Sequence, residues 1–333
     1  MKAFLTTECA MAIDPALAAD TCTYMEAIAG DGGVHDATGV WWLSPDIQLI
    51  GSASGADKAD PGVDNTVDVT LHSVAGTTCA IPPGTESLTI DLWVANPSLA
   101  MAPNNSASTA HIDSIGMPSL AAGGSETHQF HWMPAVGLPA SDPQAPGHKC
   151  LIARCYADPL IPSATNFFAP DDPHVAQHNI CIVPCGGPGA AKRPAGCGLD
   201  VTTVNPDVRK PQRTRLRATF DLNPSAAVRE VVLKRLKNTK GFGRLSSTPP
   251  RRFELRLREF PKAKVTDGTK GGGAKRPPAY EAEITLEPAQ VIALRFVADL
   301  SGAKLGDAYI FHLMQAGPEG QSQGGLTVVM MAI

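Results

Sequence analysis

The sequence predicts an all-β protein made of two tandem antiparallel β-sandwiches with long loops. From Val40 onward, runs of about five to ten residues alternate apolar with polar side chains and end at Gly, Pro, Asn or Asp, as half-buried strands do. Only one short segment suits a helix. The 333 residues are 43% hydrophobic and their Gly and Pro show no period, which excludes collagen-like, disordered and coiled-coil chains and gives room for two domains.

The N-terminal segment, residues 1–39, consists of short apolar pieces without a sustained period. Glu8 and Asp14 interrupt the apolar core that a secretory signal needs, so we expect no signal peptide. No stretch of the sequence approaches the ~20 apolar residues of a membrane helix. Two localisations are compatible with the sequence, namely the cytoplasm and export by a non-classical route.

Residues 40–183 form the first predicted sandwich, which is acidic. In its clearest strand, Val67, Val69 and Leu71 alternate with polar neighbours. Long inserts occur at 51–65 and 98–125, and the loops at 51–65 and 97–110 are the second candidates for partner contact. The predicted strands are VWWLSPDIQLI (40–50), TVDVTLHSV (66–74), SLTIDLWVANPS (87–98), ETHQFHWMP (126–134), HKCLIARCYAD (148–158) and HNICIV (178–183).

This series resembles bacterial immunoglobulin-like sandwich modules of the cell-adhesion-related, CARDB-like kind. The matching positions are a Pro-Asp pair opening an early strand (45–46), Trp-Met-Pro ending a middle strand (132–134), Cys-Leu-Ile-Ala after Gly-His (147–153), and Val175, Ala176, Gln177 and Asn179 in the last strand. The resemblance covers residues 40–183 only. It implies an immunoglobulin-like fold and a non-catalytic role as a spacer, adhesion or docking module, although one fold can host many functions.

Residues 184–208 are dense in Gly and Pro and predict a linker to the second sandwich, residues 209–333. The family of this second sandwich is not identified. Residues 226–238 suit either a short helix or a strand. The predicted strands are RTRLRATFDL (213–222), RRFELRLREF (251–260), AYEAEITLEP (279–288), VIALRFVADL (291–300), DAYIFHLMQ (307–315) and LTVVMMAI (326–333).

Charge is distributed very unevenly along the chain. Residues 1–208 carry 6 Lys and Arg against 21 Asp and Glu, whereas residues 209–276 carry 20 against 5. The formal net charge of −4 conceals this division. Such asymmetry points to contact between complementary surfaces, to binding of a polyanion, or to a solvated basic surface that has no partner.

The arginines of the basic block predict the partner site. Arg213, Arg215 and Arg217 occupy alternate positions of one strand and therefore one face, about 7 Å apart. Arg252, Arg256 and Arg258 would extend this row into a basic plate if their strand paired nearby. The guanidinium fork suits carboxylate, sulfate or phosphate. Few aromatic residues accompany the arginines, so stacking on nucleic-acid bases is not indicated.

The eight cysteines all precede residue 198, so any disulfides belong to that part of the chain, with the pairing left open. Cys181, Cys185 and Cys197 have a loose zinc-like spacing, but no Cys-x-x-Cys pair occurs, so we expect no structural zinc and no cofactor. Cys150 and Cys155 fall in a strand-like run and are expected to be core thiols or halves of a disulfide.

We therefore expect a non-catalytic structural or interaction protein that self-assembles or docks into a larger complex through its acidic and basic domains. One alternative is a binding module for an anionic glycan or nucleic acid. Another is a metal-dependent hydrolase with a site near His148, His174 and His178, whose last two members have i, i+4 spacing. No complete catalytic signature is present, so the enzyme hypothesis ranks last.

Overall fold

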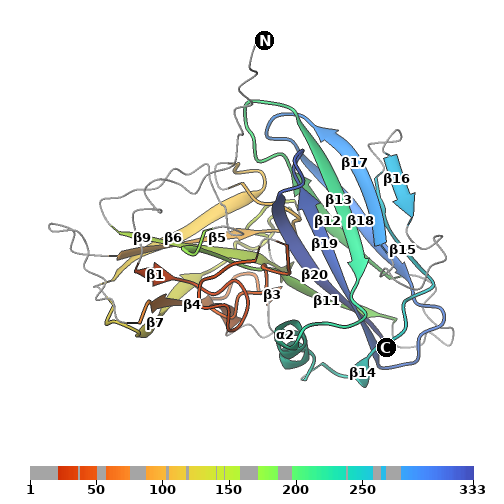
Figure 1. Ribbon diagram of the computed structural model, residues 1–333, viewed down its shortest axis with the longest axis horizontal. Coiled ribbons are helices and arrows are strands. Elements are labelled where there is room, and N and C mark those ends of the chain that lie inside the picture. Colours follow the sequence, from red (N-terminus) through yellow and green to blue (C-terminus); the bar gives the residue numbers. More distant parts are fainter. Residues whose placement is uncertain are drawn as a thin grey trace, which may run out of the picture.

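The computed structural model is an all-β protein of two antiparallel β-sandwiches, as the sequence predicts, and the part of the chain that it describes includes one short helix (Figure 1). The structure describes residues 22–36, 38–50, 58–75, 88–102, 105–117, 120–139, 141–145, 147–157, 172–186, 197–237, 239–257, 264–267 and 279–333.

The first sandwich consists of two four-stranded sheets and a two-stranded ribbon. In one sheet, β4 (Asn65–Ser73) pairs with β1 (Thr23–Tyr24), β2 (Ile47–Ile50) and β7 (Ser125–Trp132). The other has the order β10 (Val175–His178), β9 (Cys150–Ala157), β5 (Leu88–Ala95), β6 (Thr109–Met117). The ribbon is β3 (Lys58–Ala59) with β8 (Gly147–His148).

The alternation along β4 explains how the first sandwich closes. Val67, Val69 and Leu71 are fully buried, while the residues between them are half-exposed. Because side chains alternate across a strand, these apolar groups share the inner face and pack against Ile90 and Leu92 of β5.

The second sandwich has a seven-stranded and a three-stranded sheet. The larger sheet has the order β11 (Ile180–Cys185), β20 (Ser322–Ala332), β19 (Asp307–Ala316), β13 (Gln212–Phe220), β17 (Ala279–Leu286), β16 (Lys264–Asp267), and β14 (Arg244–Leu245) pairs with β19. The smaller sheet is β12 (Cys197–Val204), β18 (Val291–Asp299), β15 (Arg252–Arg256). Its core centres on a cluster of aromatic rings, namely Phe220, Phe253, Phe296 and Phe311.

The segment 226–238 resolves as helix α2 (Ala226–Leu236) rather than a strand. The Ser225 hydroxyl caps its first turn by accepting from the Val228 backbone N–H at 3.2 Å. Val228, Val232 and Leu236 recur every four residues, so one face is apolar and buried. This face packs between the two sandwiches (Figure 1).

The passage between the sandwiches differs from the predicted linker at 184–208. The chain leaves β10 of the first sandwich and enters β11 of the second through the single residue Asn179. Residues 197–204 of the predicted linker form β12, which pairs along its whole length with β18. The Gly- and Pro-rich composition hid this strand. Residues 187–196 lie outside the described part of the chain.

Candidate interaction faces and the junction between the sandwiches

The three arginines predicted to share one face of β13 do so, and their positive charge is partly neutralised by ion pairs. Arg213 and Arg215 are exposed and Arg217 is half-buried, all on the outer face of the larger sheet. Register places Arg215 opposite Glu283 and Arg217 opposite Glu281 on β17. Arg213 pairs diagonally with Glu283, and the Arg217 Nε lies 3.3 Å from a Glu281 carboxylate oxygen. Three cations therefore face two anions.

The two halves of this outer face have different surroundings. On β19 and β20, outward-facing Ile310, Val329 and Met331 are buried in the cluster shared with the first sandwich and α2. The β13 and β17 half keeps its charged side chains exposed or half-exposed. The arginine row thus borders the contact between the sandwiches without taking part in it.

The second arginine set lies elsewhere. Arg252 and Arg256 are on β15, which pairs with β18 in the smaller sheet and not with β13. Because Phe253 and Leu255 fill the core, these arginines point to the opposite outer face of the sandwich. The continuous basic plate predicted from the sequence is therefore wrong. Arg258 lies outside the described residues.

A small pocket of about 140 Å³ accompanies Arg252 and Arg256. Both guanidinium groups bind Glu254, which stands between them, at 2.7 Å from Arg252 and 3.2 Å from Arg256. Val297 and Asp299 of β18 also line the pocket, together with other residues of β15 and β18. With two carboxylates in or beside it, this pocket is less suited to an anion than the sequence pattern suggests.

The junction between the sandwiches is apolar, with a buried polar centre at Asn179. Its amide donates to the carbonyls of Ser98 (2.8 Å) and Gly325 (2.6 Å), and its oxygen accepts from the Cys150 thiol. Two tryptophans of the first sandwich reach the second, since Trp41 donates to Ser322 Oγ and Trp42 to Thr327 Oγ1, both at 3.0 Å. The acidic and basic surfaces are not what holds the two sandwiches of one chain together.

Two basic residues of α2 make polar contacts with the first sandwich. The Arg235 guanidinium lies 3.3 Å from Nε2 of His178, and Lys234 Nζ is 3.5 Å from the Gln48 amide oxygen. His178 is buried and donates from Nδ1 to the Ser44 carbonyl at 2.8 Å. His178 is thereby committed to structural contacts.

The three histidines of the hydrolase hypothesis do not form a site together. His174 bonds Asp172 at 2.9 Å, His178 bonds Ser44, and His148 belongs to the ribbon strand β8. Within the described ranges, no three His, Cys, Asp or Glu side chains gather as metal ligands would. His174 directly precedes β10 and His178 is the last residue of that strand, so the extended strand lies between them.

A Ser, His and Asp cluster that sequence reasoning missed lies on the outer face of the β5 and β6 pair. A register shift near Leu92 brings His111 and Ser114, three residues apart, beside Asp91. The Ser114 hydroxyl donates to Asp91 at 2.6 Å, and Asp91 also binds Arg154 at 3.2 Å. Because the hydroxyl proton goes to the carboxylate rather than to His111, the cluster lacks the geometry of an activated nucleophile.

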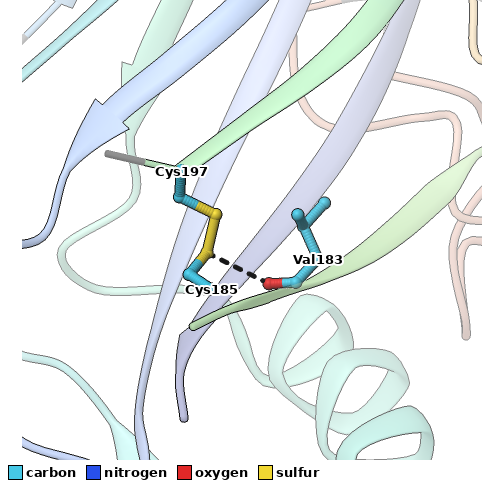
Figure 2. Close-up of a disulfide and its surroundings, with 3 residues drawn as sticks. All are labelled: Val183, Cys185 and Cys197. Carbon is cyan, nitrogen blue, oxygen red and sulfur yellow. Dashed lines mark hydrogen bonds between the residues drawn. A yellow bond between two sulfur atoms is a disulfide. The ribbon is translucent and has the colours of Figure 1, made fainter. Parts of the chain in front are cut away.

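One disulfide joins the two sheets of the second sandwich, between Cys185 at the end of β11 and Cys197 at the start of β12 (Figure 2). The Cys185 sulfur lies 3.3 Å from the Val183 carbonyl oxygen. Cys150, one of the expected core thiols, is fully buried, and burial raises the pKa of its thiol to about 12. It is therefore unreactive at neutral pH.

Comparisons with known proteins place the chain in no family. No protein-family model and no curated protein matches the sequence. Among solved structures, the collagen adhesin from S. aureus is 7% identical (86% of this chain, 93% of that chain, TM-score 0.23), and a B domain of a biofilm-associated protein is 10% identical (86% and 83%, TM-score 0.20). Red sea bream transglutaminase is 11% identical (86% and 32%, TM-score 0.19). At these scores the similarities support no inference about this chain.

The resemblance of residues 40–183 to cell-adhesion-related modules accordingly stays a prediction at the level of the family. Its implication for the fold, an antiparallel β-sandwich, is confirmed. None of the helices in the described part of the chain is long and apolar enough to cross a membrane.

Proposed function

We propose that the protein is a non-catalytic interaction subunit that assembles with other copies of itself, the β13 arginine row of one copy meeting the acidic first sandwich of the next. The observation that carries this proposal is that the junction within one chain does not use the arginine row, whose charge Glu283 and Glu281 neutralise only in part. The junction is apolar, and Arg213 and Arg215 remain exposed beside it.

The first sandwich carries exposed acidic residues, two of which, Asp64 and Glu126, also contact the histidines His131 and His128. Asp64, Asp113 and Glu126 are exposed, the last two on the neighbouring edge strands β6 and β7. A contact between two different surfaces of identical chains is heterologous, so its repetition produces rings or filaments. Complementary charge chiefly sets the specificity and the rate of such association.

The test removes the charge of the arginine row while keeping its polarity. In the variant Arg213→Gln, Arg215→Gln, Arg217→Gln, we expect monomers in sedimentation velocity at a concentration where the unaltered chain assembles. The fold should survive, because the ion pairs lost are largely solvent-exposed and each contributes about 0–1 kcal/mol. Far-UV circular dichroism checks this.

A matched control carries the same change of charge at β15, as Arg252→Gln and Arg256→Gln together with Arg251→Gln at the exposed residue just before that strand. It should assemble like the unaltered chain. Assembly that persists in the β13 variant, or that disappears equally in both variants, would contradict the assignment to this face. A monomeric unaltered chain that is retained on heparin at low salt would support an external polyanion instead.

A further inference from the structure

Lys149 is a buried amine next to a side-chain amide. It directly precedes β9, and the residue is 2% exposed. Its Nζ lies 2.7 Å from Oδ1 of Asn96 and 3.0 Å from the carbonyl oxygen of Pro143. Its hydrogen-bond partners are thus neutral oxygens rather than a carboxylate, which would normally compensate a buried ammonium.

The surroundings favour the neutral, nucleophilic form of this amine. Burial lowers the pKa of Lys149 to about 8, against 10.5 for a solvated lysine, although Cys150 and Asp142 act in the opposite direction. A desolvated lysine with a lowered pKa has a larger unprotonated fraction near neutral pH than a solvated lysine, and this is how lysine nucleophiles are activated in proteins.

Strand pairing holds the amide of Asn96 in front of the amine. Ala95 of β5 pairs antiparallel with Cys150 of β9, so Asn96, which follows Ala95, and Lys149, which precedes Cys150, lie at the same end of these neighbouring strands. The Asn96 Nδ2 donates to the Asp142 carbonyl at 3.0 Å, which fixes the orientation of the amide. The carbonyl carbon of Asn96 is therefore held close to the lysine nitrogen.

We propose that Lys149 and Asn96 condense into an isopeptide bond. The Lys149 nitrogen attacks the Asn96 carbonyl carbon, a bond between Nζ and Cγ forms, and the bond between Cγ and Nδ2 breaks. The released nitrogen leaves as ammonia after taking a proton that the amine gives up. No oxidation state changes, and no external reactant is needed.

Asp142 is the group to carry that proton. Its backbone carbonyl already holds the departing nitrogen, and the negative charge of its carboxylate acts on Lys149. The residue is half-buried, and one carboxylate oxygen accepts from the Gln144 backbone N–H at 2.8 Å, which orients it.

The bond would tie two strands together close to the junction, because Cys150 belongs to the junction cluster and Ser98 lies near Asn96 in sequence. It would give the first sandwich a covalent link, as the disulfide gives one to the second. This inference does not depend on the proposed self-assembly.

Intact mass spectrometry of the full chain, denatured and reduced, tests the proposal. We expect a mass lower than the sequence mass by one ammonia molecule, and a branched peptide in the digest that joins the segments around Asn96 and Lys149. A full sequence mass, or separate unmodified peptides from these segments after prolonged incubation at a pH of about 8, would overturn it.

Matched variants separate this reaction from other losses of ammonia. Lys149→Arg keeps a long cationic side chain and Asn96→Ala removes the acceptor, so both should show their full sequence masses. Asp142→Asn keeps a side-chain oxygen that can accept from the Gln144 backbone N–H, but its amide cannot carry a proton as the carboxylate does. Most chains of this variant should therefore lack the isopeptide bond. Equal cross-linking in Asp142→Asn would contradict the role of that carboxylate.

Discussion

At the scale of single residues, the junction depends on a close approach between Trp42 and Gly325. A Cβ atom added at Gly325 would overlap the indole ring of Trp42, and one added at Gly324 would overlap the Leu99 carbonyl oxygen. Only hydrogen at these positions lets β20 pass beneath the first sandwich. The indole N–H then reaches Thr327, which also contacts His312 at 3.1 Å.

Replacing Gly325 by alanine should therefore weaken the junction. We expect Gly325→Ala to lower the free energy of unfolding by about 1–3 kcal/mol, because the overlap forces Trp42 or the strand to move. Gly302→Ala, where an added Cβ meets nothing within 4 Å, should change it by less than about 0.5 kcal/mol. Urea denaturation measures both, and equal stabilities would contradict the packing described.

His72 gives the first sandwich a pH-dependent contribution. Its Nε2 lies 2.9 Å from Asp46, and this hydrogen bond, opposed by burial, raises the pKa of His72 above its usual 6.5. A raised pKa in the folded state means stability that is full below 6.5 and is lost as pH rises through the folded value.

The variant His72→Gln can still donate to Asp46 but does not titrate. The difference in free energy of unfolding between the unaltered chain and this variant should therefore be larger at acidic than at alkaline pH. Urea denaturation at both extremes measures it. A difference that is constant with pH, or that grows on the alkaline side, would contradict the coupling.

At the scale of elements, β11 and β12 hold the second sandwich together at its edge. β11 pairs in parallel with β20 of the larger sheet, and β12 pairs with β18 of the smaller one. Their ends, Cys185 and Cys197, have Cα atoms 5.3 Å apart and are joined by the disulfide (Figure 2). The disulfide therefore links two strands that belong to different sheets and do not pair with each other.

Removing the bridge should cost stability, because a cross-link restricts the unfolded chain. We expect Cys185→Ala with Cys197→Ala to lower the free energy of unfolding by about 2–4 kcal/mol. Guanidinium denaturation of the unaltered chain and of this variant, both under oxidising conditions, measures the loss. Identical midpoints and slopes would show that the bridge does not stabilise the sandwich.

The sequence predicted strands better than it predicted their partners. Period-2 alternation located the strand regions around Val67, Leu216 and Leu294, because burial of one face is a local property. Which strands pair is decided by contacts far apart in the chain. The Glu281 and Glu283 partners of the arginine row, and the assignment of β15 to the other sheet, could therefore not be read from spacing.

β12 and the Asn179 crossover were missed for different reasons. Gly and Pro around residues 186–198 obscured the start of β12, whose own sequence, CGLDVTTV, alternates only weakly. Asn179 looked like part of a continuous strand, because its neighbours on both sides are strand residues. Its role depends on carbonyls of Ser98 and Gly325 that local sequence does not reveal.

At the scale of the whole molecule, apolar contact and charge act at different places. A shared cluster that includes Trp42, Ile180 and Val232 unites the two sandwiches and α2 into one body. Part of the basic block of residues 209–276, including Arg213 and Arg215, stays exposed on the outer surface. This separation makes the charges available to a second copy, which is the basis of the proposed assembly.

The most direct test of this claim is the molar mass in solution, measured by light scattering at about 50 mM and about 500 mM salt. Screening shortens the reach of exposed charges severalfold over this range. We expect large particles at low salt that fall to the 34.8 kDa monomer at high salt. A monomer under both conditions, or assemblies indifferent to salt, would contradict assembly through opposed charges.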